Sequence, residues 1–176
     1  MRTIISIGLL LAAGVAQAET NLYGHFGVAF GGERLVTVEF EDGSDEDLRA
    51  GSGFALNLGL VHHIEDSPFS LQTGIGYFTH TTSAANSNAR FSRYPLEVLG
   101  FWNNGDHRFG GGLVHHMSPT LNLDNLGGKV SFDAASGFAL EYGYRFFSVR
   151  YTTIDYSYGG FDIGGESIGA YLSMGY

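Results

Sequence analysis

The last nine residues alternate between apolar side chains and small or polar ones with a period of two. One face carries Ile168, Leu172, Met174 and Tyr176, and the other carries glycine, tyrosine and serine. Only an extended strand separates neighbouring residues in this way, because successive side chains point to opposite faces. The end of the chain is therefore predicted to be a β-strand with one apolar face.

The same alternation recurs in seven earlier segments, namely 22–30, 54–61, 69–80, 91–102, 108–117, 134–144 and 147–158. Short turns are predicted at 65–68, at 103–106 and near Arg145, and longer connections separate the other neighbours. In the seventh segment the alternation changes phase near Thr152 and Thr153, which predicts a bulge. Eight strands joined alternately by short and long connections predict an all-β, eight-stranded antiparallel up-and-down barrel.

Two kinds of barrel share this pattern. A soluble barrel of the lipocalin kind buries its apolar face, whereas a transmembrane barrel turns that face towards lipid. Charged residues are 15% of the chain, against about 25% in ordinary soluble domains. The polar face also carries Arg93, Glu97, Arg108, Glu141 and Arg150, which a ligand cavity would not usually hold. Both features favour the transmembrane barrel.

The terminal strand resembles the closing strand and assembly signal of bacterial outer-membrane barrels. The alternation and the asymmetry of the connections resemble the small outer-membrane proteins of the OmpA-transmembrane, OmpW and OmpX kind. This resemblance implies short periplasmic turns, long extracellular loops and both mature termini in the periplasm. It also implies outer-membrane lipid, lipopolysaccharide and the barrel-assembly machinery as partners.

The beginning of the chain has the pattern of an export signal. Arg2 precedes an apolar run over 4–15, and Ala16, Gln17 and Ala18 form a small-residue cleavage pattern. We therefore expect residues 1–18 to be removed and residues 19–176 to form the barrel. A formal net charge of −9 with one lysine argues against nucleic acid as a partner.

Eight strands enclose a lumen that side chains can fill. We expect the five inward charged residues to form a paired, hydrogen-bonded network, with a narrow ion path as the alternative. The favoured function is a non-enzymatic structural or surface-interaction role, in which residues 31–52 and 118–133 are the contact surfaces. Passage of a small hydrophobic solute is a third hypothesis, which the inward charges disfavour.

One stretch suggests catalysis. His116 and Ser118 are two apart on a predicted strand, so that they are expected to share a side and could pair as base and nucleophile. Here the chain resembles the lipid A 3-O-deacylase barrels, whose His-x-Ser motif acts with a downstream glutamate. Glu141 or Asp133 would be the third member, but Pro119 stands where that family has asparagine.

No cofactor or metal site is predicted. The histidines do not follow the spacing of a zinc motif. The acidic run at 41–47 could hold Ca²⁺ or Mg²⁺ between lipopolysaccharide phosphates, although it lacks the EF-hand pattern and solvation is the simpler reading.

Overall fold

The structure is a computed structural model that describes residues 18–39, 42–84, 87–123 and 128–175. Twelve β-strands are formed by these residues. No helix among them is long and apolar enough to cross a bilayer. The predicted export signal lies outside the described residues except for Ala18, with which the first strand begins.

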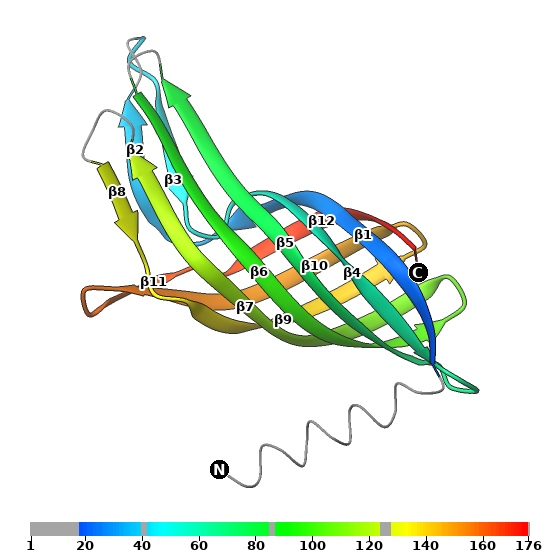
Figure 1. Cartoon of the computed structure of the whole chain (residues 1–176). Coiled ribbons are helices and arrows are strands. Elements are labelled where there is room, and N and C mark those ends of the chain that lie inside the picture. Colours follow the sequence, from blue (N-terminus) through cyan, green and yellow to red (C-terminus); the bar gives the residue numbers. More distant parts are fainter. Residues whose placement is uncertain (1–17, 40–41, 85–86, 124–127, 176) are drawn as a thin grey trace, which may run out of the picture.

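Eight antiparallel strands form the barrel, and they match the eight segments predicted from the alternation. They are β1 (Ala18–Gly31), β4 (Gly53–Ile64), β5 (Phe69–Ala84), β6 (Ser87–Asn104), β7 (His107–Leu123), β9 (Ala135–Tyr144), β10 (Phe147–Tyr158) and β12 (Ser167–Met174). Each strand pairs with the next in the ring, and β12 pairs with β1 from Gly24↔Met174 to Gly31↔Ser167. The ring is closed, so the prediction of an eight-stranded barrel is confirmed (Figure 1).

The two ends of the barrel differ. Short turns lie at one end, here called the turn end, at the predicted positions between β4 and β5, β6 and β7, and β9 and β10. At the opposite loop end, long stretches predicted as loops contain further strands: a hairpin of β2 (Arg34–Glu39) and β3 (Asp45–Arg49), β8 (Gly128–Ser131) paired with β7, and β11 (Phe161–Gly164) paired with β10. Strands β5, β6 and β7 also run beyond their predicted ends, so that they extend past the other barrel strands at the loop end (Figure 1).

The predicted bulge near Thr152 and Thr153 is wrong. Strand β10 alternates without interruption between exposed and buried side chains from Phe147 to Tyr156. The sequence pattern changes there because Ile154 and Tyr156 are apolar residues that point inward, into a cluster at the loop end. The polarity of the two faces inverts while the backbone keeps its register.

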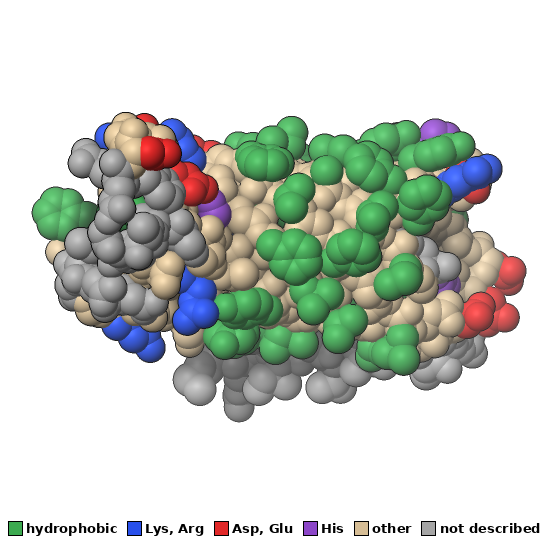
Figure 2. Space-filling view, turned by 90° about the horizontal axis from the view of Figure 1, so that it is seen from above, with side chains coloured by type: hydrophobic (Ala, Val, Ile, Leu, Met, Phe, Trp, Pro, Cys, Tyr) green, Lys and Arg blue, Asp and Glu red, His purple; other side chains and the backbone are tan. Residues whose placement is uncertain are grey.

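A belt of exposed apolar side chains surrounds the middle of the barrel, and charged side chains gather at its two ends (Figure 2). The belt includes Leu56, Leu58, Leu60, Ile75, Leu96, Val98, Leu113, Phe138, Leu140, Tyr151 and Ile168, each between 38% and 65% exposed. Exposure of so much contiguous apolar surface is unfavourable in water, and it is what a lipid-facing barrel requires. The belt therefore favours the transmembrane barrel over the lipocalin kind.

The largest apolar cluster lies at the loop end, where the hairpin covers the mouth of the barrel. Val38 of β2 and Leu48 of β3 pack there with Phe91, Phe132 and Tyr156. The aromatic rings meet edge to face, with Phe91 5.4 Å from Tyr156 and 5.6 Å from Phe132 between centroids. We call this cluster the aromatic cap.

Candidate functional site

Five side chains form a closed ring of hydrogen bonds inside the barrel. Arg150 donates from Nη1 to Glu97 Oε2 at 2.7 Å and from Nε to Glu141 Oε2 at 2.7 Å. Arg108 donates from Nη2 to Glu141 and from Nη1 to Gln72 Oε1 at 3.3 Å. Gln72 closes the ring by donating to Glu97 Oε1 at 3.0 Å. These residues come from five neighbouring strands, β5, β6, β7, β9 and β10, so the ring ties that side of the barrel together.

Strand β1 adds two contacts from the facing side of the lumen. The Tyr23 hydroxyl donates to Glu97 Oε1 at 2.5 Å, and His25 Nδ1 lies 3.2 Å from Arg150 Nη2. Both side chains are at most 3% exposed. The contacts therefore cross the lumen and fill its section. The alternation along β1 puts Tyr23 and His25 on the same face, but the sequence pattern does not connect them to the charged residues, because the contact is between strands far apart in the chain.

Arg93 lies apart from this network. It is fully buried, and its guanidinium stacks on Phe78 at 3.6 Å and faces Phe91 at 4.8 Å and Tyr156 at 5.8 Å from the ring centroids. Its Nε and Nη1 atoms have no hydrogen-bond partner within the described part of the chain. The aromatic faces stabilise the cation, but no carboxylate neutralises it among the described residues. Of the five predicted inward charges, four meet in one network and Arg93 belongs to the underside of the aromatic cap.

Only a small space remains between the network and the cap. A cavity of about 20 Å³ is lined by Asn57, Phe78, Glu97, His116 and Arg150, among others. A volume of this size holds about one water molecule. Among the described residues, the lumen is therefore filled at two levels, first by paired charges and then by aromatic rings.

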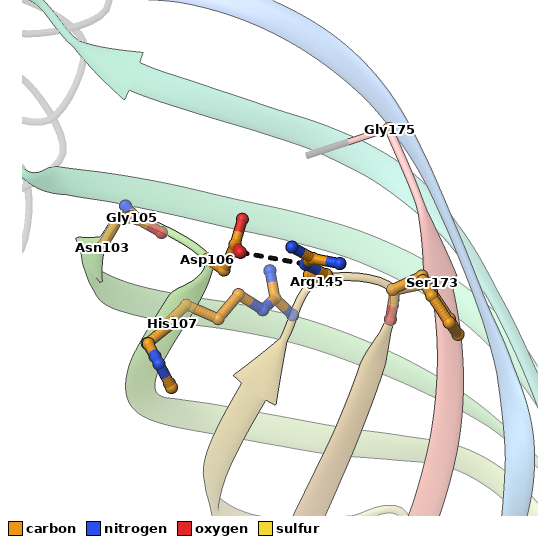
Figure 3. Close-up of a pocket in the computed structure, with 9 residues that line it drawn as sticks. Asn103, Gly105, Asp106, His107, Arg145, Ser173 and Gly175 are labelled. Carbon is orange, nitrogen blue, oxygen red and sulfur yellow. Dashed lines mark hydrogen bonds and ion pairs between the residues drawn. The ribbon is translucent and has the colours of Figure 1, made fainter.

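The turn end of the barrel is hollow. A pocket of about 430 Å³ lies there, with Asp106 and Arg145 facing each other across it (Figure 3). Arg145 Nε donates to Asp106 Oδ2 at 2.9 Å, and this hydrogen bond raises the pKa of the guanidinium. Arg108 and Ser173 also line the pocket, which ends at the charged network. The charged network therefore forms the inner end of the pocket.

The residues of the catalytic hypothesis do not assemble, and the expectation that His116 and Ser118 share a side is wrong. His116 is 4% exposed, and its Nδ1 is hydrogen-bonded to the Tyr156 hydroxyl at 2.6 Å. Ser118 is exposed and has a φ of 48°, next to a register shift opposite Ser92 and Tyr94. This bulge inserts a residue and changes the phase of the strand. Ser118 therefore points outward, whereas His116 points inward.

The proposed third members lie elsewhere. Glu141 is 4% exposed, and both of its carboxylate oxygens are engaged by Arg108 and Arg150. Asp133 is exposed, and its backbone N–H donates to Ser157 O at 3.0 Å. Neither carboxylate has a hydrogen bond to His116 in the described part of the chain, so neither one orients that imidazole as a general base.

A different histidine and serine do meet on the outer surface. His115 Nδ1 lies 2.9 Å from Ser136 Oγ, where the two residues are paired across β7 and β9. No carboxylate among the described residues is hydrogen-bonded to this His115, and the strand N–H groups around it are engaged in the sheet. Nucleophilic catalysis usually requires an orienting acid and an oxyanion site beside such a pair, and the described residues show neither at His115 and Ser136.

The closing strand presents its predicted faces. Ile168, Leu172 and Met174 are exposed by 57%, 40% and 64%, whereas Tyr171 and Ser173 are buried. Tyr176, the fourth residue of the predicted assembly signal, lies outside the described residues. The outward face of β12 is therefore available to lipid along its whole described length.

The acidic run is organised by local contacts. In its described part, Asp42 accepts hydrogen bonds from Ser44, and Asp47 accepts one from Thr37 Oγ1 at 2.8 Å. The Thr37 hydroxyl and the nearby arginines lower the pKa of Asp47. No group of three His, Asp or Glu side chains that could hold a metal ion is found among the described residues.

Comparisons with known proteins are informative for the fold alone. No protein-family model matches the sequence, and no curated protein does. Among solved structures, the chain is similar to Ail, the attachment invasion locus protein of Yersinia pestis, solved in complex with the heparin analogue sucrose octasulfate. The identity is 13% over 90% of this chain and 99% of that chain, with a TM-score of 0.51. Ail without that ligand gives 11% and 0.47 over the same shares. Neisserial surface protein A gives 10% and 0.44 over 88% of this chain and 97% of that chain.

The likeness to the first of these structures agrees with the closed ring and the apolar belt. The chain has the fold of the small eight-stranded outer-membrane β-barrels.

Proposed function

We propose that this protein is a non-enzymatic outer-membrane barrel with a structural or surface-interaction role. The observation that carries the proposal is the double closure of the lumen, by the ring from Gln72 to Arg150 and by the aromatic cap. A closed lumen does not support diffusion, and the scattered catalytic candidates do not support hydrolysis. Two features are left to carry a function. The apolar belt can contact lipid, and the folded loop end can contact a partner.

In this proposal residues 1–18 direct export, and the barrel has its loop end outside the cell. Both mature termini then lie in the periplasm, and residues 31–52 and 118–133 form the surface for partners. The exposed face of β12, with Ile168, Leu172 and Met174, is the part that the barrel-assembly machinery would recognise. Lipid contacts the belt, and lipopolysaccharide surrounds the loop end.

The structure similar to this one offers a limited parallel. Ail of Yersinia pestis was solved in complex with sucrose octasulfate, a heparin analogue. The parallel supports a contact role rather than an enzymatic one, and it does not name the partner of this chain.

Single-cysteine labelling tests the proposed orientation, because the chain contains no cysteine of its own. Ser44 lies beyond β2 at the loop end, and Glu65 lies in the turn between β4 and β5. Both are exposed. A membrane-impermeant maleimide should label S44C in intact cells and E65C only after the outer membrane is permeabilised.

The matched pair makes the outcomes distinct. Labelling of E65C but not S44C in intact cells would place the loop end in the periplasm and overturn the orientation. Labelling of neither variant, even after permeabilisation, would show that the chain is not in the envelope.

A further inference from the structure

The outward side of β5, β6, β7 and β8 carries two polar rows beyond the apolar belt. The strand register aligns Thr79, Ser92, Thr120 and Ser131 in one row and Thr81, Arg90, Asn122 and Lys129 in the next. We call these eight residues the polar face. Their inward neighbours Phe91 and Leu121 belong to the aromatic cap, so the polar face points away from the barrel axis.

The chemistry of the polar face is one-sided. It contains five hydroxyl groups, one amide and two basic groups, and it contains no carboxylate, in a chain whose net charge is −9. Within the described part of the chain, Arg90 and Lys129 take part in no ion pair, whereas Arg34 and Arg49 both contact Asp47. Arg90 and Lys129 are exposed. The face thus carries hydroxyl, amide and basic groups, and its two positive charges take part in no ion pair with the described residues.

The spacing of the two bases fits phosphate groups. Arg90 and Lys129 each pair with Asn122 from opposite sides, so their Cα atoms are about 10 Å apart, two strand spacings. Both side chains are long, so they can converge on one phosphate or hold two neighbouring ones. An arginine fork and a lysine ammonium are the usual protein partners of phosphate oxygens. In the first row the Thr120 hydroxyl donates to Ser118 O at 3.1 Å and the Thr79 hydroxyl is buried. Ser92 and Ser131 therefore carry the hydroxyl groups that can donate beside the two bases.

The height of the polar face relative to the belt selects the source of the phosphate. Tyr77 and Tyr94 form an aromatic pair, 5.5 Å between centroids, at the upper edge of the belt. Such pairs mark the boundary between lipid and water. Arg90 lies four residues beyond Tyr94, about 13 Å along the strand, or about 10 Å in height after a strand tilt of about 40°. The headgroup layer on each side of a bilayer is about 5–8 Å thick.

The hydroxyl row therefore lies within the headgroup layer, and Arg90 and Lys129 lie just beyond its outer edge. The polar face points away from the barrel axis, in the plane of the membrane. Its ligand is therefore a neighbouring lipid with a large headgroup, whose phosphate lies farther from the hydrocarbon core than the hydroxyl row. We infer that the polar face binds the phosphates of a phosphorylated glycolipid of the lipid A type. This inference rests on the proposed outer-membrane placement, with the loop end outside.

Equilibrium binding to the refolded barrel tests the inference. The protein is refolded in uncharged micelles and titrated with fluorescent bis-phosphorylated lipid A, and with the same lipid lacking its phosphates. The wild type should bind the phosphorylated form at least tenfold more tightly. R90Q and K129Q should each weaken that binding about fivefold, as expected for one base near an anionic surface.

Two further variants sharpen the result. N122D places a carboxylate between the two bases and should weaken binding as strongly as R90Q/K129Q, about 25-fold, which is the product of two fivefold effects. R145Q is the matched control. It removes one positive charge at the turn end, where Arg145 is hydrogen-bonded to Asp106, and it should bind lipid A like the wild type. Circular dichroism and the heat-dependent gel shift of the folded barrel verify that each variant is folded.

The outcomes separate this inference from the proposed function. Equal binding of lipid A by R90Q/K129Q and the wild type would overturn the inference, as would an equal loss in R145Q. Equally tight binding of phosphatidylglycerol would overturn the choice of a glycolipid, and equally tight binding of soluble sucrose octasulfate would overturn the choice of a lipid. Failure of the wild type to insert into bilayers at all would instead overturn the proposed function.

Discussion

Replacing Arg150 by methionine should destabilise the barrel far more than the same replacement of Arg93. Both arginines are at most 5% exposed and point into the lumen. Arg150 contacts Glu97 and Glu141 at 2.6–2.7 Å, whereas Arg93 stacks on Phe78 and has no carboxylate partner among the described residues. The two substitutions are matched in chemistry and burial, so they isolate the effect of the carboxylate partners.

The magnitude follows from what each substitution leaves behind. R150M leaves Glu141 with Arg108, and it leaves Glu97 with Tyr23 and Gln72 but with no arginine among the described residues. Breaking a buried ion pair in this way costs about 3–5 kcal/mol. R93M removes a buried charge that has no carboxylate partner. It loses a cation–π contact of about 2 kcal/mol, and it regains much of this because the desolvation of the cation is no longer required. We expect R93M to change the free energy of unfolding by less than about 1.5 kcal/mol.

Urea unfolding of each variant, refolded in the same phospholipid vesicles and followed by tryptophan fluorescence, measures the two free energies. The single tryptophan, Trp102, lies in the belt near the turn end and reports on lipid contact. The double variant E97Q/R150M should recover part of the loss, because Glu141 keeps Arg108 and Glu97 no longer carries a buried charge. Equal losses in R150M and R93M, or no recovery in the double variant, would refute the reasoning about paired charges.

Three smaller predictions concern the barrel wall and the hairpin. G27A should impair folding yield in the gel-shift assay, because a Cβ there would lie 2.1 Å from Ala170 O, whereas G100A should fold normally because its Cβ would meet nothing within 4 Å; equal yields would contradict this. L58R places a charge in the middle of the belt and should cost about 2–4 kcal/mol in vesicle unfolding; an unchanged unfolding midpoint would show that Leu58 does not face lipid. The contact of Thr37 with Asp47 should be lost as the pH falls through the lowered pKa of that carboxyl, because the contact stabilises the ionised form. The protection factors of the hairpin amides, which compare exchange with that of the unfolded chain at the same pH, should therefore fall in acid in the wild type and be low at all pH values in D47N. A fall in D47N as large as in the wild type would refute this assignment.

Much of the barrel is predictable from sequence because lipid imposes a strict rule on the outer face. Residues such as Leu58, Leu140 and Ile168 alternate with small or polar ones wherever the strand crosses the belt, so the strands could be placed from a period of two. Turns such as Asn103 to Asp106 are local in sequence, and their residue types restrict the backbone directly.

The loop end could not be predicted in the same way, because the rule inverts there. Beyond the belt, water lies outside and the apolar side chains point inward, so Ile154 and Tyr156 looked like a phase change. The hairpin of β2 and β3 depends on packing against Phe91 and Phe132, which are far away in the sequence. Such contacts exist only in the folded chain.

The sequence predicts which residues of the candidate site point inward, but it does not predict which of them contact one another. The inward phase of Glu97, Arg108, Glu141 and Arg150 follows from counting residues along each strand. Which of them meet depends on the stagger between strands, and this stagger is not encoded in one strand alone. The bulge at Ser118 separates this serine from His116. Its one local signal is Pro119, because proline within a sheet lies at edges, strand starts or bulges.

The closure of the lumen is tested most directly by the conductance of a planar bilayer that contains the refolded protein. Two barriers in series, the charged ring and the aromatic cap, predict that the wild type gives no stable conductance steps. R150M should give none either as long as the aromatic cap is intact. Regular ohmic steps from the folded wild-type barrel would contradict the account, because they would require a continuous water path through the lumen.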